Sequence, residues 1–398
     1  MKVGPSAGIS FVWLTSVAGQ RPEWWNQTDV EKLAQVVSGQ TGAVSWRAHP
    51  EFKLALATPD VNEVVSASDR IAANIASAAA PSVAFERVQD LGSQWAETSA
   101  DGLTFAIGTA GSRNVEVTLG DERQQRHNAL VTGAIGQGKS NLLKVIVHSL
   151  CQRYAPSELD LYMLDFKDGV TLFPFASTPS SVDYLPHARV LGLESDRDFG
   201  VAVLRHLDAE ISRRSKLFRP YGDNISKYRA AVPDAPVPRI VLIVDEFQMM
   251  FDPVDKNAED AAQLLEGLAR RGRSSGVHII LASQTISGIA ALMTRENGIF
   301  AQFPIRIALK NSVGESFATL TQGNDAAARL RARGEAVLNL DYGAQPANQQ
   351  AVIAVADDSV LARLQRKWWE AAKSSSMPPL VFDGSRLVGL AEATSAIR

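Results

Sequence analysis

One segment constrains the fold of this chain more than any other: the glycine-rich run at 133–140, which reads Gly-Ala-Ile-Gly-Gln-Gly-Lys-Ser. It follows a short apolar run at 128–132 that predicts a strand, and it precedes residues 141–152, whose pattern predicts a helix. Between a strand and a helix, the spacing Gly-x-x-x-x-Gly-Lys-Ser is typical of a phosphate-binding loop, whereas a chance glycine-rich turn would not require both neighbours. The segment therefore predicts an α/β domain with a nucleotide site at the end of a strand.

Each type of residue in this loop has a predicted task. Its three glycines let the backbone wrap closely, so that successive N–H groups point at phosphate oxygens and the next helix adds its positive N-terminal end. Lys139 would supply a charge to the β- and γ-phosphates, and the Ser140 hydroxyl would ligate Mg²⁺. We expect ATP to be bound by Gly133, Gly136, Gln137, Gly138, Lys139, Ser140 and Asn141.

An acidic pair follows a second apolar run. Residues 239–244 predict a fully buried strand, and Asp245 and Glu246 come directly after it. Asp245 is expected to anchor Mg²⁺ together with Ser140, and Glu246 to polarise the attacking water as a general base, which favours hydrolysis over nucleotide sensing. Two acids after a strand can also cap the next helix, and that alternative stays open.

Two weaker signals lie further along the chain. Gln284 follows a predicted strand at 277–282, where its amide would face the γ-phosphate or a water, or would be a polar turn residue. The basic run 270–273 ends a predicted helix at 257–271. Its arginines either complement the helix dipole or supply Arg273 to a neighbouring subunit as an arginine finger. Catalytic roles are thus predicted for Glu246, Gln284 and Arg273.

Short strands and longer helices alternate from about Leu103, which predicts a mainly parallel sheet flanked by helices, as in RecA-like P-loop NTPases. Residues 1–100 carry turn and helix signals and are expected to form a small α/β or helical appendage, and residues 101–357 the ATPase domain. Residues 358–398 are expected to form a helix and a loose tail after Ser374. Further strands are expected at 114–119, 159–166, 305–309, 336–340 and 351–355, and further helices at 198–218 and 358–372.

Composition sets limits on partners and compartment. The net charge of -3 and the pI near 6.1 argue against a strongly basic surface that coats a polynucleotide, although they leave a small basic patch open. Cys151 is the single cysteine, so an intrachain disulfide is impossible and a reducing compartment, the cytoplasm, is expected. No apolar run is long enough to cross a bilayer.

Taken in order, these elements resemble the FtsK/SpoIIIE branch of the HerA–FtsK ATPases over roughly residues 103 to 356. The matching segments are Ile107–Thr109, Asn128–Gly133 with the loop, Leu164–Lys167, Leu185–His187, Val244–Phe247, Gly272–His278, Leu281–Gln284 and Arg306–Leu309.

The resemblance implies a RecA-like motor that forms a homo-oligomeric, usually hexameric, ring around duplex DNA or, in the type VII secretion relatives, works on protein substrates. It assigns nucleotide and Mg²⁺ to Lys139 and Ser140, the acid pair to Asp245 and Glu246, the sensor role to Gln284, and the trans-acting arginine to Arg273. Arg270, Arg271 and Arg306 are substitutes for that arginine if the loop geometry differs. The membrane helices and the winged-helix DNA reader of the translocases have no counterpart here, and only one P-loop is present.

Three functions remain in competition. The first is a duplex-DNA translocase whose channel loops would be residues 167–174 and the stretch after Gln284 through Arg295. The second is a motor for protein substrates, in which the pairs Trp24-Trp25 and Trp368-Trp369 would contact a peptide or partner. The third is an assembly protein that uses ATP to switch its oligomeric state.

Overall fold

In the computed structural model the chain divides into two units, Met1–Ala79 and Ala80–Arg398. The described residues of the first unit are 37–40, 43–46 and 49–54, and they form a three-stranded antiparallel sheet of β1 (Val37–Gln40), β2 (Ala43–Trp46) and β3 (His49–Leu54). The helices predicted in this region and Trp24-Trp25 lie outside the described residues. In the second unit the structure describes residues 82–121, 123–167, 169, 171–177, 183–235, 237–287, 289 and 298–384.

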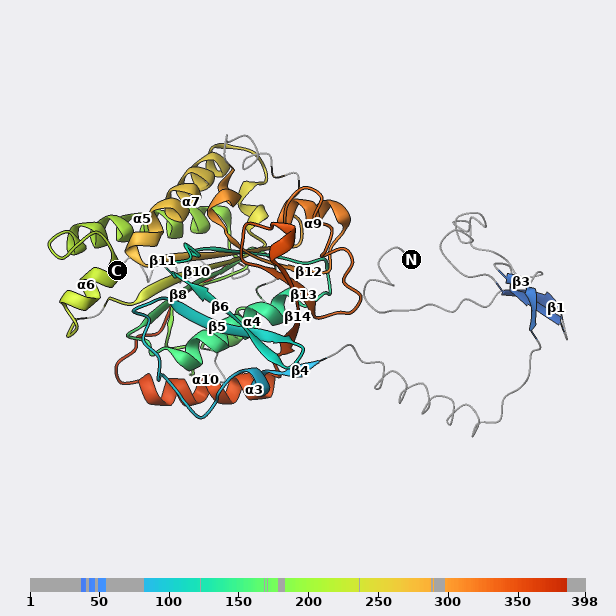
Figure 1. The fold of residues 1–398 in the computed structure, drawn as a ribbon, viewed down its shortest axis with the longest axis horizontal. Coiled ribbons are helices and arrows are strands. Elements are labelled where there is room, and N and C mark those ends of the chain that lie inside the picture. The colour runs from blue at the N-terminus through green and yellow to red at the C-terminus, as the bar shows by residue number, and fades with distance from the viewer. Residues whose placement is uncertain are drawn as a thin grey trace, which may run out of the picture. The chain divides into compact units, whose positions relative to one another are not determined.

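A large mixed sheet forms the centre of the second unit, and over the described residues it has twelve strands (Figure 1). Its spatial order is β15-β9-β8-β10-β11-β7-β12-β13-β14-β5-β6, with β4 beside β14. The strands are β4 (Val83–Ala84), β5 (Leu103–Ala110), β6 (Arg113–Leu119), β7 (Ala129–Thr132), β8 (Leu159–Asp165), β9 (Ala188–Leu193), β10 (Arg239–Asp245), β11 (Val277–Ser283), β12 (Ile305–Leu309), β13 (Glu335–Asn339), β14 (Asn348–Val355) and β15 (Leu380–Asp383).

Pairing is parallel from β15 through β12 and antiparallel from β12 through β6. The strand before the glycine-rich loop, β7, lies between β11 and β12, in the middle of the sheet. All seven residues of β10 are buried, as expected of a parallel strand with both faces covered. This arrangement brings the carboxyl ends of β7, β8, β10 and β11 to one edge. The predicted α/β fold with a mainly parallel sheet is confirmed.

Helices cover both faces of the sheet (Figure 1). One face packs on α4 and α10 around a core that includes Trp368, and the other packs on α5 and α7 around a core that includes Leu265. The helices are α3 (Phe85–Val88), α4 (Lys139–Arg153), α5 (Arg197–Phe218), α6 (Ile225–Ala231), α7 (Lys256–Ser275), α9 (Val313–Thr319) and α10 (Asp358–Ala372), with short 3-10 turns η2 (Phe173–Phe175), η3 (Phe247–Phe251), η4 (Ile299–Gln302) and η5 (Gln345–Ala347).

The ends of the long helices follow local sequence signals. Asp255 caps α7 by accepting a hydrogen bond from the Ala258 N–H, and Asp196 caps α5 in the same way. The last turn of α7 closes on Gly276, whose φ of 70° is a left-handed conformation that glycine adopts without strain. Within the described ranges, no helix combines the length and apolar character that crossing a membrane requires.

The second unit begins earlier in the chain than residue 101, where the ATPase domain was predicted to start. The second unit begins at Ala80, because β4 pairs with β14 and the fully buried Phe85 of α3 belongs to the core of the large sheet. Residues 99 and 100 are also tied to it, since the buried guanidinium of Arg239 donates to their backbone carbonyls. The boundary was missed because 82–100 contribute short segments whose partners lie far away in the chain.

The tail also differs from the prediction of a loose end after Ser374. Residues Leu380–Asp383 form β15, which pairs in parallel with β9 at the edge of the sheet, and Phe382 stacks on Phe199 with 4.3 Å between ring centroids. Four residues are too few to show a period, so only the open edge of β9 reveals this strand.

Trp368, predicted as half of a partner-binding pair, is a core residue. Its side chain is fully buried, and its indole N–H donates to Gln152 Oε1 over 3.2 Å. Trp369 beside it contacts the Tyr184 ring and the Lys373 ammonium. The interpretation of Trp368 as an exposed contact is therefore wrong, because α10 turns that face onto α4.

Candidate nucleotide-binding site

The glycine-rich loop joins β7 to α4 at the carboxyl edge of the sheet. Gly136 and Gly138 have φ values of 78° and 106°, which a side chain would strain, and Gly138 directly precedes the first residue of α4, Lys139. Gly133 serves packing instead, because a Cβ there would lie 3.1 Å from the Leu309 side chain on β12. The loop therefore presents backbone N–H groups and the start of a 15-residue helix to the same space.

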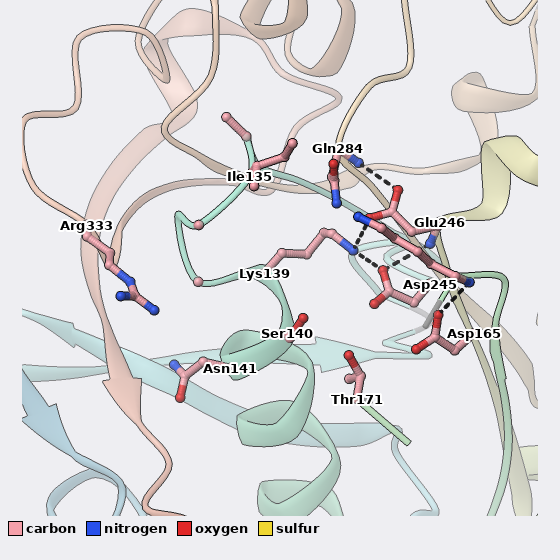
Figure 2. Close-up of a pocket in the computed structure, with 14 residues that line it drawn as sticks. Ile135, Lys139, Ser140, Asn141, Asp165, Thr171, Asp245, Glu246, Gln284 and Arg333 are labelled. Carbon is pink, nitrogen blue, oxygen red and sulfur yellow. Dashed lines mark hydrogen bonds and ion pairs between the residues drawn. The ribbon is translucent and has the colours of Figure 1, made fainter. Parts of the chain in front are cut away.

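Three carboxylates face this loop from two neighbouring strands (Figure 2). Asp165 ends β8 and Asp245 ends β10, and the two residues are direct partners in the parallel register. Glu246 follows in a left-handed conformation, with φ 52° and ψ 44°, which is uncommon for a residue with a side chain. Because strain of this kind persists where surrounding contacts enforce it, Glu246 has the character of a functional residue.

The ammonium of Lys139 lies between the acids. It forms an ion pair with Asp245 and another with Glu246, where Nζ and Oε1 are 2.9 Å apart, and all three side chains are at most 7% exposed. Burial opposes the charge of Lys139, but the attraction of Asp245 and Glu246 outweighs it and raises the lysine pKa. The side chain predicted to bind phosphates is thus held by the acidic pair.

A separate set of contacts fixes Glu246. Gln248 Nε2 donates to Glu246 Oε2 over 2.6 Å, and the Gln248 carbonyl oxygen accepts from the Ser283 hydroxyl over 2.7 Å. Burial opposes ionisation of Glu246, but the bond from Gln248 and the charge of Lys139 lower its pKa. A carboxylate that stays ionised and oriented has the properties of a general base.

Asp165 differs from the other two acids. Burial, with a smaller contribution from the charge of Asp245, raises its pKa to about 6, while the bond from the Lys167 N–H to Oδ1, 2.9 Å long, acts in the opposite direction. Three acids close together in a partly dry site cannot all ionise freely. Burial also raises the pKa of Asp245, against the pull of Lys139, so Asp165 and Asp245 are both harder to ionise than ordinary aspartates, whereas Glu246 is easier to ionise than an ordinary glutamate.

These groups line one pocket of 240 Å³. Of the residues predicted from sequence, it contains Gly136, Gly138, Lys139, Ser140, Asn141, Asp245, Glu246 and Gln284. Gly133 and Gln137 do not line it. Six lining residues were not predicted to bind nucleotide or metal or to act in catalysis: Ala134 and Ile135 of the loop, and Asp165, Lys167, Thr171 and Arg333. The pairing that brings Asp165 beside Asp245 exists only in the folded sheet, and no local sequence signal marked Arg333.

Two predicted residues have additional roles. The Asn141 side chain donates to the Ala354 carbonyl over 2.8 Å and accepts from the Ala356 N–H over 2.9 Å, so it ties α4 to the end of β14. Gln284 follows β11, and its backbone N–H reaches Glu246 Oε2 over 3.4 Å. Figure 2 shows the Gln284 side chain at the acid end of the pocket, as a sensor role requires. Both roles in nucleotide binding stay predictions.

Arg273, the predicted arginine finger, lies at the edge of the sheet opposite the pocket. Arg273 is exposed in the last turn of α7, before the seven-residue strand β11 leads to the pocket edge. At about 3.3 Å per residue, the strand alone separates Arg273 from its own pocket by roughly 20 Å. The residue therefore lies too far away to serve its own site, and its predicted role in trans stays open.

The proposed substitutes for Arg273 are held elsewhere. Arg270 pairs with Glu266 over 2.7 Å, and Arg271 pairs with Asp208 on α5. Arg306 is buried and donates to the carbonyls of Phe300, Phe303, Thr319 and Leu320, and burial lowers its pKa to about 10. Arg306 is therefore wrong as a substitute, because its guanidinium braces the chain between η4 and α9.

The predicted channel segments also meet the site. In the first, Lys167 and Thr171 line the pocket, and the channel role of this segment stays a prediction. In the second, the Ile286 N–H donates to the Glu315 carboxylate of α9 over 2.8 Å, and Ser287 contacts the same group. Positions 168, 170, 288 and 290–295 lie outside the described residues.

A phosphate loop, an ion-paired loop lysine and a strand-end acid pair on a parallel sheet define the class of P-loop ATPases. Residues 88–288, about half of the chain, match the FtsK/SpoIIIE family. The chain belongs to this family, as the sequence resemblance predicted.

Individual relatives are components of secretion systems. The ESX secretion system protein EccC of Geobacillus thermodenitrificans is 30% identical over 239 residues, which are 58% of this chain and 15% of that protein. The ESX secretion system protein YukB of Bacillus subtilis is 27% identical over 61% of this chain and 16% of its own length. The chain thus spans about a sixth of the length of these relatives.

Solved structures agree on the fold. The cytoplasmic domain of the Thermomonospora curvata type VII secretion ATPase EccC superposes with a TM-score of 0.60 at 22% identity, over 78% of this chain and 36% of that one. The pCW3 conjugation coupling protein TcpA, with ATPγS, gives a TM-score of 0.54 at 23% identity, over 68% of this chain and 70% of that one. At these identities the likeness establishes the architecture alone.

Proposed function

We propose that this chain is an ATP-hydrolysing module of a motor that moves protein substrates in a secretion system. The proposal depends on one combined observation. The phosphate loop and the acid pair line the same pocket, and the relatives that match this chain in sequence are secretion-system proteins. This choice favours the second of the three functions derived from sequence over the DNA translocase placed first.

ATP would lie on the loop with its γ-phosphate toward the acids. Lys139 would leave its partners Asp245 and Glu246 and bind the β- and γ-phosphates, so that nucleotide exchanges one set of buried ion pairs for another. Glu246, still held by Gln248, would then be free to accept a proton from the attacking water. Gln284 would contact the γ-phosphate or that water.

Mg²⁺ fits the chemistry of the oxygen donors present. Ser140 and Asp245 both line the pocket, and hydroxyl and carboxylate oxygens suit this ion. Over the described part of the chain, no three acidic, histidine or cysteine side chains meet closely enough to hold a metal alone. Mg²⁺ would therefore take its other ligands from phosphates and water, and when bound it would neutralise phosphate charge.

Assembly supplies what one chain lacks. Arg273 lies at the far end of β11 from its own site, so a ring in which each subunit lends Arg273 to its neighbour would complete every pocket. We propose a homo-oligomeric, hexameric ring in the cytoplasm, as a single module or as part of a longer chain. The named relatives are about six times as long as the matched region, which accommodates either form.

The test is the effect of substrate on the rate of ATP hydrolysis. Wild-type protein and Glu246→Gln would be assayed alone, with linear duplex DNA of several lengths at low salt, and with a signal-sequence peptide of a type VII substrate. We expect hydrolysis by the wild type alone, with stimulation by the peptide and none by DNA. Stimulation by DNA that grows with length would replace this proposal with the translocase. Slow turnover that responds to neither, with ATP-dependent changes in oligomeric state, would support the assembly protein.

A further inference from the structure

The roles above leave unexplained a cation that lines the pocket: Arg333, in the loop between α9 and β13. It lines the pocket but lies across the glycine-rich loop from Asp165, Asp245 and Glu246 (Figure 2). Its guanidinium is directed toward the side of the loop where Asn141 lies. A cation at this position is too far along the pocket to take part in the ion pairs of Lys139.

The backbone that carries Arg333 is firmly fixed. The Glu335 carboxylate accepts hydrogen bonds from the N–H groups of Arg331 and Ala332, over 2.7 and 2.9 Å. Gly334 turns the chain with a φ of 84°, and its carbonyl accepts from the Ile353 N–H of β14 over 2.8 Å. A turn held in this way fixes the backbone from which the Arg333 side chain extends, which lowers the entropic cost of binding through that side chain.

The side chain itself is uncommitted. Arg333 is exposed, and among the described residues it has no hydrogen bond and no ion pair. By contrast, neighbouring Arg329 is paired with Asp325 over 2.8 Å. An arginine on a fixed turn, aimed into a phosphate pocket with no carboxylate partner, has the planar donors that bind phosphate oxygens well.

The direction of the nucleotide decides which part Arg333 meets. Lys139 and the acids mark the γ-phosphate end, and the loop N–H groups that follow bind the α- and β-phosphates. The nucleotide therefore runs from the acids across the loop toward Arg333. We infer that Arg333 binds the nucleotide in cis at its α-phosphate and ribose end, away from the reacting γ-phosphate.

This inference rests on the nucleotide-binding part of the proposed function, and it makes a distinct prediction. A contact at the α-phosphate end is the same in ATP and ADP, and it is equally strong before and during hydrolysis. Loss of the Arg333 side chain should therefore weaken the binding of ATP and of ADP by the same factor. It should also raise KM for ATP while kcat stays unchanged.

The experiment compares Arg333→Ala, Arg333→Lys and the matched control Arg331→Ala, which removes an exposed arginine two residues away that does not line the pocket. Binding of ATPγS and of ADP in the presence of Mg²⁺ is measured by calorimetry. For Arg333→Ala we expect both Kd values to rise about tenfold, the low end for a hydrogen bond to a charged group because the side chain is exposed. The Kd values of Arg333→Lys should lie between those of the wild type and Arg333→Ala, and Arg331→Ala should change Kd less than about twofold.

Two results would overturn the inference while the wild type binds nucleotide normally. One is a Kd for Arg333→Ala equal to that of Arg331→Ala. The other is a weaker affinity of Arg333→Ala for ATPγS with an unchanged affinity for ADP, which would place the guanidinium at the γ-phosphate. If the wild type binds neither nucleotide, the proposed function itself fails and this inference fails with it.

Discussion

Gln248 Nε2 lies 2.6 Å from Glu246 Oε2, and the same Gln248 accepts from the Ser283 hydroxyl at the end of β11. The carboxylate expected to act as the base is thus oriented by a side chain two residues along, which is in turn oriented by the next strand. Glu246 itself occupies a left-handed conformation, so its direction depends on such contacts.

We predict that Gln248→Ala lowers kcat for ATP hydrolysis about 10- to 100-fold with less than a twofold change in KM, because a base contributes about 10²–10⁴-fold when it is aligned. Steady-state kinetics provide the measurement. Met249→Ala is the control, since that neighbouring side chain is 45% exposed and should leave kcat unchanged. Equal kcat values for the two variants would show that Gln248 does not orient Glu246.

Lys139 has a structural role in addition to phosphate binding. Lys139→Ala leaves Asp245 and Glu246 buried without their cation, and breaking a buried pair costs about 3 kcal/mol. We therefore expect this variant to lose nucleotide binding and also stability in chemical denaturation at pH 7.5. Lys144→Ala, on the same helix, removes a pair to the 81% exposed Asp358 and should cost less than about 1 kcal/mol. If Lys139→Ala, measured without nucleotide, is as stable as Lys144→Ala, Lys139 does not have this structural role.

Arg273 lies roughly 20 Å from its own pocket, so any catalytic effect must reach a neighbouring subunit. Arg273→Ala should retain ATP binding and lose about a thousandfold in turnover, as arginine fingers do. Mixing Arg273→Ala with Lys139→Ala should partly restore activity, because mixed rings contain pockets with both groups. Arg270→Ala, which removes an arginine already paired with Glu266, is the matched control. No recovery on mixing would mark Arg273 as a helix-end charge.

Buried histidines should make stability fall in mild acid. Burial is the main cause that lowers the pKa of His127 and His148 to about 4, of His187 to about 3, and of His278 well below its ordinary value. The unfolded chain takes up these protons near pH 6.5 and the folded chain does not, so stability is present above 6.5 and is lost as the pH falls toward 4.

In this range each buried histidine lowers the free energy of unfolding by up to about 1.4 kcal/mol for each pH unit of acidification. Asp165, whose pKa is raised to about 6, acts with the opposite sign and offsets part of this loss. We expect a loss on the order of 5 kcal/mol between pH 7 and pH 5, measured by urea denaturation. His148→Gln, which removes one of these buried rings, should reduce the slope by about a quarter. A flat profile would mean that the buried rings take up protons in the folded state.

Local sequence patterns were enough to predict those parts of the site that each lie within one short segment. The loop at Gly133–Ser140 and the acids after β10 were predictable because strand, turn and helix signals adjoin them, and the alternation of elements required a parallel sheet. Since parallel strands end at one edge, the meeting of the loop with Asp245 and Glu246 followed from the pattern.

Tertiary structure alone decided the rest. Asp165 joins the acids because β8 pairs with β10 in register, and β15 forms because β9 has an open edge. Arg333 reaches the pocket from the loop between α9 and β13, far along the chain from the glycine-rich loop. The tertiary structure also decided that Trp368 and Arg306 are buried, since burial depends on which distant segments pack against each side chain. Such pairings connect residues far apart in the chain, and no local period records them.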